Sequence, residues 1–568
     1  MLPSGLLAAL AVAFFLGLPH LGSEQLWFDE VLSWSIYRRS PTMAEMTAYL
    51  ASNENHPPLY YYLMRGWTAM VGDAPAMLRL PSVLFTVLTV GLLYALARRW
   101  FGHRIAAMAA MIAALSPLAV EFSREARPYA LLSALAVASW LALSRFLDSG
   151  NAWWMAGYVA LTLGGLYTHY AYVFLAASQF LLGSFVASRP PSRASPWRGS
   201  RTVLLAAAGA MAAGYAPWMS VLAAKLAEQY IYPAGLTPLA QLATPPNFIL
   251  ADMVFNVLFL PAKWPADGLG RTAEAMAVVG VLVGVVIAGR AAWRAYGQTA
   301  ETRSSAIPWG RLLMVLVWCL VPPLLYLFSP IAGRYSWYYH RHLITVLPAI
   351  ALLTALGLDQ LGRLLRPMLS PAVVGVGVAL LVSINVPQYM INDSRWDPQH
   401  QFADVSRYLE QHAGDGRELI LGFWADHRIL LDYSYRGRQT VGSLVPQRRY
   451  SNQLEIVSGL PRLTPMEGYL LTHPSIPYRR YRLPDALADY DRIWVVSLVP
   501  DLFDLDVALA AAGFRPTFVE LPEPIRLALF RFERGGAAGK RIATASTAAG
   551  GPFRRLAAGL PPSCGYRP

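Results

Sequence analysis

Two adjacent carboxylates near the N-terminus are the first residues that could do chemistry. Asp29 and Glu30 lie in EQLWFDEVLSWS, residues 24–35, among tryptophans and aliphatic side chains. A carboxylate beside apolar surroundings can accept the proton of an attacking hydroxyl group and act as a general base. Adjacent helical residues point about 100° apart, so the two acids cannot share one function. The pair also fits solvated or capping acids, so both interpretations stay open.

A histidine followed by two prolines and three tyrosines is a second candidate. The segment NENHPPLYYYLMRGW covers residues 53–67, and its prolines suit the first turn of a helix. Tyr60 and Tyr61 would place their rings where apolar and polar surroundings meet. His56 fits either a polar residue before a turn or a site residue. Its position in the same long loop as Asp29 favours the site.

The arginines of SREARPYALL, residues 123–132, could bind an anion. Arg124 and Arg127 follow an apolar segment. The guanidinium group presents a planar fork of N–H donors that matches the oxygens of a phosphate. The same segment also fits an interfacial turn in which the arginines pair with Glu121 and Glu125.

A second cationic cluster lies in GRYSWYYHRHLITVLP, residues 333–348. Arg341 stands between His340 and His342, directly after Tyr339. A belt of aromatic residues at a membrane interface would explain the rings but not the cations. The cluster therefore favours an anion-binding site.

The composition places these residues in a membrane protein. The chain has 568 residues, of which 55% are hydrophobic and 14% charged, with a mean hydropathy of +0.37. Such a chain is too apolar for an ordinary soluble protein. The net charge of +13 is explained by topology and anionic lipids, because no nucleic-acid-binding motif is present. The two cysteines, Cys319 and Cys564, provide no disulfide framework.

Apolar runs of about 17 to 25 residues, enough to cross a hydrocarbon core of about 30 Å, predict about eleven transmembrane helices. They are expected at residues 3–21, 81–97, 105–121, 130–146, 152–168, 170–187, 202–220, 273–290, 312–329, 343–359 and 371–389. The first lacks the basic start and the cleavage site of a signal peptide, so we expect it to be retained. The apolar but shorter segment 249–261 is expected to be interfacial or re-entrant.

Arginines in alternate loops predict the orientation, because cytoplasmic loops collect arginine and lysine. The arginine-rich loops contain residues 98–104, 145, 189–201, 290–311 and 363–366. With these loops inside, the long loop 22–80, the short links around Arg127 and YTHY, and everything after residue 390 lie outside. All the candidate residues then share the outer face.

The composition changes after residue 394, where a small α/β domain is expected. FADVSRYLEQHA has helical amphipathic spacing, and ELILGFW and DRIWVVSLV have the pattern of buried strands. The predicted organisation is a transmembrane module at 1–394, an extracytoplasmic α/β domain at 395–534 and a disordered tail at 535–568.

Taken together, these motifs resemble the polyprenyl-phosphate-dependent glycosyltransferases of the GT-C fold, in the bacterial group related to protein O-mannosyltransferases and the lipid A aminoarabinose transferase. The resemblance covers residues 20–390 and rests on the order and spacing of WFDE, HPPLYYYL with LRLPS, SREARPYALL, YTHYAY and YYHRHLITVLPAI. It implies an enzyme of the bacterial inner membrane. Such an enzyme takes a sugar from a lipid-linked phosphosugar on the periplasmic side and inverts its anomeric configuration.

The resemblance also assigns roles to residues at matching positions. Asp29 becomes the candidate general base with Glu30 as its supporting neighbour, and Arg341 becomes the leading ligand of the donor phosphate. The other expected phosphate ligands are His340, His342, Arg127 and Arg124. The expected residues of the substrate loops are His56, Tyr60, Tyr61, His169 and Tyr339.

The resemblance leaves the metal requirement open. His56 stands where some relatives carry a lysine after a metal-binding glutamate, but in this chain Asn55 precedes it and Glu54 lies one step earlier. Glu54 and His56 are therefore the metal candidates, and a divalent metal is allowed but not required. No nucleotide cofactor is needed, because a lipid-phosphate sugar is already activated, and the sequence lacks a P-loop and a Rossmann fingerprint.

Two other functions stay open on the sequence alone. A lipid-glycan transporter or flippase would also need spans, arginines and aromatic loops, although transporters usually place ionisable groups near the middle of the bilayer. A non-catalytic glycan-assembly subunit would keep the fold without the chemistry. For the transferase, the expected partners are a polyprenyl-phosphate sugar, membrane lipids and a glycan, lipid or protein acceptor, with no nucleic acid.

Overall fold

The structure of the chain is a computed structural model. It describes residues 3–54, 56–187, 200–230, 309–327, 339–365, 401–414, 416–445, 487–497, 509–510, 512–522, 525 and 527–535. The expected spans 273–290 and 371–389, the expected interfacial segment 249–261 and the expected tail beyond Gly535 lie outside these residues.

Internal contacts divide the chain into two compact units. One consists of Met1–Gly22 and Ser40–Asn392, and the other of Ser23–Arg39 and Asp393–Pro568. The boundary at residues 392–393 lies close to the one expected after residue 394, but the second unit also includes residues 23–39 of the first long loop.

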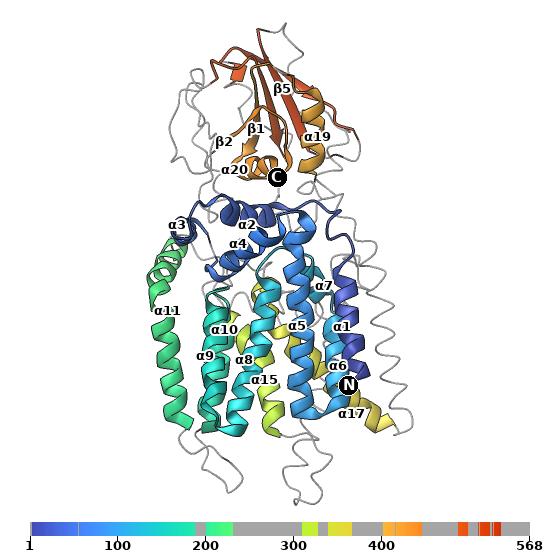
Figure 1. Ribbon diagram of the computed structural model, residues 1–568, viewed down its shortest axis with the longest axis vertical. Helices are drawn as coiled ribbons and strands as arrows, with labels where there is room; N and C mark the ends of the chain where they lie inside the picture. Colours follow the sequence, from blue (N-terminus) through green and yellow to red (C-terminus); the bar gives the residue numbers. More distant parts are fainter. Residues whose placement is uncertain are drawn as a thin grey trace, which may run out of the picture. The chain divides into compact units, whose positions relative to one another are not determined.

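The first unit is built from apolar helices, and α1, α5, α6, α8, α9 and α11 run side by side (Figure 1). The elements are α1 (Ser4–Gly17), α3 (Met43–Asn53), α4 (Leu59–Val71), α5 (Pro75–Phe101), α6 (His103–Ala114), α7 (Pro117–Ser123), α8 (Tyr129–Ser149), α9 (Ala152–Leu166), α10 (Tyr172–Ala187), α11 (Ser200–Tyr230), α15 (Trp309–Leu327), α16 (Tyr339–His342), the 3-10 helix η3 (Ile344–Val346) and α17 (Leu347–Leu365). Every expected span that falls on described residues coincides with a helix.

Fewer of these helices than expected are long enough to cross a membrane. Among the described residues, α5, α8 and α11 have the required length and apolar composition, and the pair α6 and α7 makes a fourth candidate. This pair is bent by 57°. The bend has a local cause, because Pro117 opens α7 and has no backbone N–H to continue the helical hydrogen bonds of α6. By length and composition, the described helices account for three to four of the eleven expected spans.

Ion pairs join the arginine-rich ends of the helices. Arg99 at the end of α5 and Arg311 at the start of α15 both pair with Asp148 at the end of α8, and the Arg99–Asp148 distance is 2.6 Å. Arg104 of α6 lies 3.1 Å from the buried Asp359 of α17. Among the described residues, Arg99, Arg104 and Arg311 thus lie at helix ends, each paired with a carboxylate.

Gly165 allows a close approach between α9 and α10. A Cβ atom on Gly165 would lie 2.4 Å from two ring carbons of Tyr172. Tyr172 is fully buried, and its hydroxyl donates to Ser139 Oγ at 2.9 Å, which holds the ring in place. The glycine is therefore required by packing.

We expect Gly165→Ala to destabilise the protein by about 1–3 kcal/mol, the usual cost of overpacking a core. The midpoint of thermal unfolding in detergent measures the effect. Gly157→Ala in the same helix is the matched control, because a Cβ atom there meets nothing within 4 Å. Equal unfolding midpoints for the two variants would contradict the packing explanation.

The second unit contains a five-stranded mixed sheet in the order β2-β1-β3-β5-β4. Strands β1, β2 and β3 are parallel, whereas β5 and β4 are antiparallel to their neighbours. The elements are α2 (Phe28–Arg39), α19 (Phe402–His412), β1 (Glu418–Trp424), α20 (Ala425–Ser434), β2 (Thr440–Val445), β3 (Arg492–Ser497), β4 (Phe514–Val519) and β5 (Ala528–Arg534). β1 covers the segment ELILGFW, and α19 covers most of FADVSRYLEQHA.

The core of the sheet follows from the alternation of side chains along its strands. Leu419 and Leu421 of β1 share one face with Ile493 and Val495 of β3, and all four are fully buried. Ile420 points to the other face and is also buried, so β1, an inner strand of the sheet, is covered on both sides. Burial on both faces explains the continuous apolar run of β1.

Candidate functional site

Asp29 and Glu30 occupy the first turn of α2, in the second unit. Glu30 is fully buried, and its Oε2 accepts a hydrogen bond from the backbone N–H of Trp27 at 3.2 Å. This is the reciprocal bond of a capping box, which satisfies a backbone donor at the start of the helix. Glu30 therefore supports the local structure, and the half-buried Asp29 stays the predicted base.

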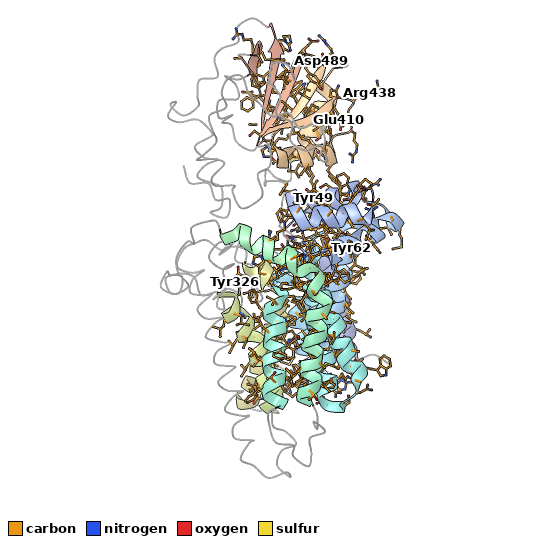
Figure 2. All side chains as sticks on the ribbon, turned by 90° about the vertical axis from the view of Figure 1, so that its left-hand side faces the viewer. Tyr49, Tyr62, Tyr326, Glu410, Arg438 and Asp489 are labelled. Carbon is orange, nitrogen blue, oxygen red and sulfur yellow. The ribbon has the colours of Figure 1, made fainter. Side chains whose placement is uncertain are left out.

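The first unit brings three histidines from distant segments into one row. The ring centroids of His56 and His169 are 5.0 Å apart, and those of His169 and His342 are 5.3 Å apart. Tyr326 of α15, labelled in Figure 2, extends the row, because its hydroxyl lies 3.1 Å from His342 Nδ1. We call His56, His169 and His342 the histidine row.

Two guanidinium groups lie against the same aromatic ring beside this row. The Cζ atoms of Arg127 and Arg341 are each 5.9 Å from the centroid of Tyr129, and the ring of His169 is 6.0 Å from that centroid. Arg127 is only 4% exposed, so its charge is held in surroundings of low dielectric. Glu121 of α7 interacts electrostatically with Arg341.

Backbone hydrogen bonds position the segments that carry the histidine row. The N–H of Leu59, at the start of α4, donates to the carbonyl of Tyr167 at 2.9 Å and joins the His56 loop to the His169 link. Trp318 Nε1 donates to the carbonyl of Thr345 at 2.8 Å and ties η3, close to His342, to α15.

His169 is an uncharged donor rather than a cation. Its Nδ1 accepts a hydrogen bond from the backbone N–H of Ala171 at 3.0 Å, which places the proton of the neutral ring on Nε2. Burial holds the pKa of His169 well below its usual range, and electrostatic interactions with His56, His342 and Arg127 lower this pKa further. His169 can therefore offer an N–H group to an anion at neutral pH.

Glu54 and His56 form a carboxylate–histidine pair. Glu54 Oε1 lies 2.7 Å from His56 Nδ1, and Glu54 is buried. In the part of the chain that the structure describes, no group of three or more His, Cys, Asp or Glu side chains is arranged to hold a metal ion. The two metal candidates by themselves thus do not form a fitting donor set.

Three other expected site residues have structural contacts. Arg124 donates from Nε and Nη2 to the carbonyl of Leu16, at 3.1 and 2.6 Å, and so satisfies an open carbonyl near the end of α1. Tyr60 and Tyr61 are buried within the helical unit, where their rings pack edge to face at 5.8 Å. The side chains of Tyr339 and His340 lie outside the described residues.

Two aromatic residues of the site were not predicted. Tyr129 lies within the SREARPYALL motif, between Arg127 and the apolar helix. This position could have indicated from the sequence that Tyr129 lies near the arginine. Tyr326 stands in the apolar run of α15 and resembles any interfacial tyrosine. Only the packing of α15 against its neighbours brings it to His342.

Comparisons with known proteins show what the chain is similar to. Residues 55–219 match the family model of dolichyl-phosphate-mannose-protein mannosyltransferases. The crystal structure of ArnT from Cupriavidus metallidurans in the apo state has a TM-score of 0.55 and 14% sequence identity, and the match covers 92% of this chain and 97% of that chain. The form of ArnT bound to undecaprenyl phosphate gives the same TM-score and identity over 94% and 98% of the two chains.

A more distant likeness is the archaeal oligosaccharyltransferase AglB from Archaeoglobus fulgidus, in complex with an inhibitory peptide and a dolichol-phosphate. It has a TM-score of 0.47 and 12% identity, over 90% of this chain and 70% of that chain. A comparison with curated proteins found no match. The fold inferred from the motifs is confirmed: the chain shares the GT-C fold of the ArnT structures.

Proposed function

We propose that this protein is an inverting glycosyltransferase of the bacterial inner membrane. It moves a sugar from a polyprenyl-phosphate donor to an acceptor hydroxyl on the periplasmic side. The observation that carries the proposal is the convergence of Arg127 and Arg341 on Tyr129, next to the histidine row. Two guanidinium groups and the neutral imidazole N–H donor of His169 form a set suited to a phosphate.

The arginines would act on the leaving group. When the bond between the anomeric carbon and the phosphate oxygen breaks, its electron pair stays on that oxygen and negative charge grows there. Arg127 and Arg341 would stabilise this charge more strongly in the transition state than in the ground state. Their partial burial strengthens the effect, since few water molecules screen them.

The acceptor side requires a base. The acceptor hydroxyl oxygen forms a new bond to the anomeric carbon from the face opposite to the phosphate, which inverts the configuration. Its proton must leave as the bond forms, and Asp29 is proposed to accept it. Glu30 assists indirectly by fixing the first turn of α2 through its bond to Trp27.

The orientation of the first unit supports a site on the outer face. Helix α8 begins at Tyr129, beside Arg127, and ends one residue after Asp148, where the arginine-rich ends gather. If that end is cytoplasmic, as arginine-rich loops usually are, Tyr129 and the histidine row lie at the opposite membrane surface. The placement of the described cations at helix ends favours a transferase over a transporter, whose ionisable groups usually lie near the middle of the bilayer. The retained Asp29 weighs against a non-catalytic subunit.

The proposal is tested with a panel of synthetic polyprenyl-phosphate sugars, each labelled in the sugar, in nanodiscs containing the full chain. The acceptors are short glycan, lipid and peptide hydroxyl compounds, and product is detected by mass spectrometry. We expect one donor to be consumed with inversion at the anomeric carbon. Binding and transbilayer movement of a donor without chemistry would instead establish the transporter. A parallel arm with EDTA tests whether Glu54 and His56 serve a metal.

A further inference from the structure

Helix α2 is held by the α/β unit, and this contact bears on the proposed base. Residues 23–39 cluster with Asp393–Pro568, and α2 packs against α20. The sequence alone assigns α2 to the transmembrane module. Asp29 is thus carried by a helix whose packing partner is encoded far away in the chain.

An aromatic pair contributes to this contact. Trp34 of α2 and Tyr433 of α20 meet edge to face, with ring centroids 4.9 Å apart and an interplanar angle of 79°. Such pairs contribute about 0.5–1.5 kcal/mol beyond the burial of their area. Trp34 is buried, so its large ring fixes the rotation of α2 about its own axis.

A hydrogen bond provides a second attachment. The backbone N–H of Ala403, in the first turn of α19, donates to Gln25 Oε1 at 2.8 Å. The first N–H groups of a helix have no partner within the helix, so Gln25 satisfies a donor that α19 leaves open. This bond holds the chain immediately before α2, while Tyr433 holds the helix itself.

The attached face of α2 differs from the face that carries Asp29. Residues five positions apart in a helix lie roughly 140° apart around its axis, so Asp29 points away from the Trp34 side. Glu30 lies one turn before Trp34 and belongs to the attached side, where it closes the capping box. One face of α2 therefore serves for attachment, and another presents the acid.

Helix α20, which packs against α2, is itself attached to the rest of the α/β unit. His427, near the start of α20, is buried against Phe402 of α19, with ring centroids 5.5 Å apart. Burial lowers the pKa of His427 to about 3, and the neutral ring donates to the backbone carbonyl of Val496 in β3. Helix α20 is thereby tied to the central sheet, and α2 is tied to α20.

We infer that the α/β unit orients the proposed base, with Tyr433, Trp34 and Gln25 as positioning residues for Asp29. This inference rests on the proposed function. The residues need not touch substrate, because they act through the direction of the Asp29 carboxylate. Displacement of a catalytic group by about 1 Å can cost on the order of a hundredfold in rate, so such attachment has a large effect on turnover.

The test uses the full chain with Tyr433→Ala, and with Tyr408→Ala as the matched control. Tyr408 belongs to the same unit but stacks on His412 within α19, at 3.9 Å between ring centroids. We expect Tyr433→Ala to lower kcat by about tenfold or more with little change in KM for the donor. Tyr433→Phe keeps the ring and should restore most of the rate. Tyr408→Ala should leave both constants near those of the wild type.

A double-mutant cycle separates positioning from general destabilisation. If Tyr433 acts through Asp29, adding Tyr433→Ala to Asp29→Asn should change the residual rate by less than about twofold, since interacting residues are non-additive. Hydrogen exchange gives a second readout that does not need a donor. Amides of residues 28–39 should exchange faster in Tyr433→Ala than in Tyr408→Ala, while those of α5 stay unchanged.

The outcomes distinguish this inference from the proposed function. If Asp29→Asn keeps near-normal turnover, Asp29 is not the base and the proposed mechanism fails. If Asp29→Asn is inactive but Tyr433→Ala behaves like Tyr408→Ala in rate and in exchange, only the positioning inference is overturned. Full additivity of the two substitutions would overturn it as well.

Discussion

Asp29→Asn is expected to lose most of the sugar transfer while the protein folds and inserts normally. Asparagine has nearly the same shape as aspartate but cannot accept the proton of the acceptor hydroxyl. General base catalysis contributes typically about 10²–10⁴-fold, so a loss of this size is expected in kcat. The measurement is the initial rate of transfer at saturating donor, together with the thermal unfolding midpoint.

Asp404→Asn is the matched control for this substitution. Asp404 is an aspartate in the first turn of α19, in the same unit, and it forms an ion pair with Arg407. Its replacement makes the same chemical change at a comparable helical position, and little change in rate is expected. A variant Asp29→Asn with turnover close to that of Asp404→Asn would remove Asp29 from the mechanism.

Arg341→Ala and Arg127→Ala are each expected to reduce kcat/KM for the donor by about 10²–10³-fold, the usual cost of removing one preorganised donor to developing charge. Each guanidinium group has its own position beside Tyr129. We therefore expect that neither arginine can take the place of the other. Arg127→Lys and Arg341→Lys should recover only part of the loss, because lysine keeps the charge but not the planar fork of donors.

Binding of polyprenyl phosphate, the common product of every donor in the panel, separates donor recognition from chemistry. We expect the two alanine variants to bind it more weakly, measured by quenching of intrinsic tryptophan fluorescence. Arg124→Ala is the control from the same segment, since its guanidinium contacts the carbonyl of Leu16. It should lower the unfolding midpoint and leave binding unchanged. Unchanged binding in Arg341→Ala would argue against the phosphate site.

Local patterns in the sequence determined much of the secondary structure. Apolar runs coincide with α5 and α8, and the buried pattern of ELILGFW coincides with β1. These features depend on the periodicity of neighbouring residues, which can be recognised from the sequence alone. The role of Glu30 is local as well, because a capping box joins residues three positions apart.

Tertiary structure decided which candidate residues meet. His56, His169 and His342 lie in three segments, and nothing in their local sequence fixes the distances between their rings. The same limit applies to Arg124, whose motif fits a phosphate ligand while its actual partner is the end of α1. Side chains far apart in the chain are brought together by helix packing, which depends on many weak contacts at once.

The sequence by itself determined that this is a membrane protein with cations, histidines and an acidic pair in motifs of the GT-C type, because composition and motif spacing are properties of the linear chain. Only the tertiary structure placed α2 with the α/β unit, through Trp34 against Tyr433 and Gln25 against the start of α19. Both contacts join residues separated by most of the chain. Such pairing is set by which surfaces fit and bury each other on folding, and no local pattern encodes it.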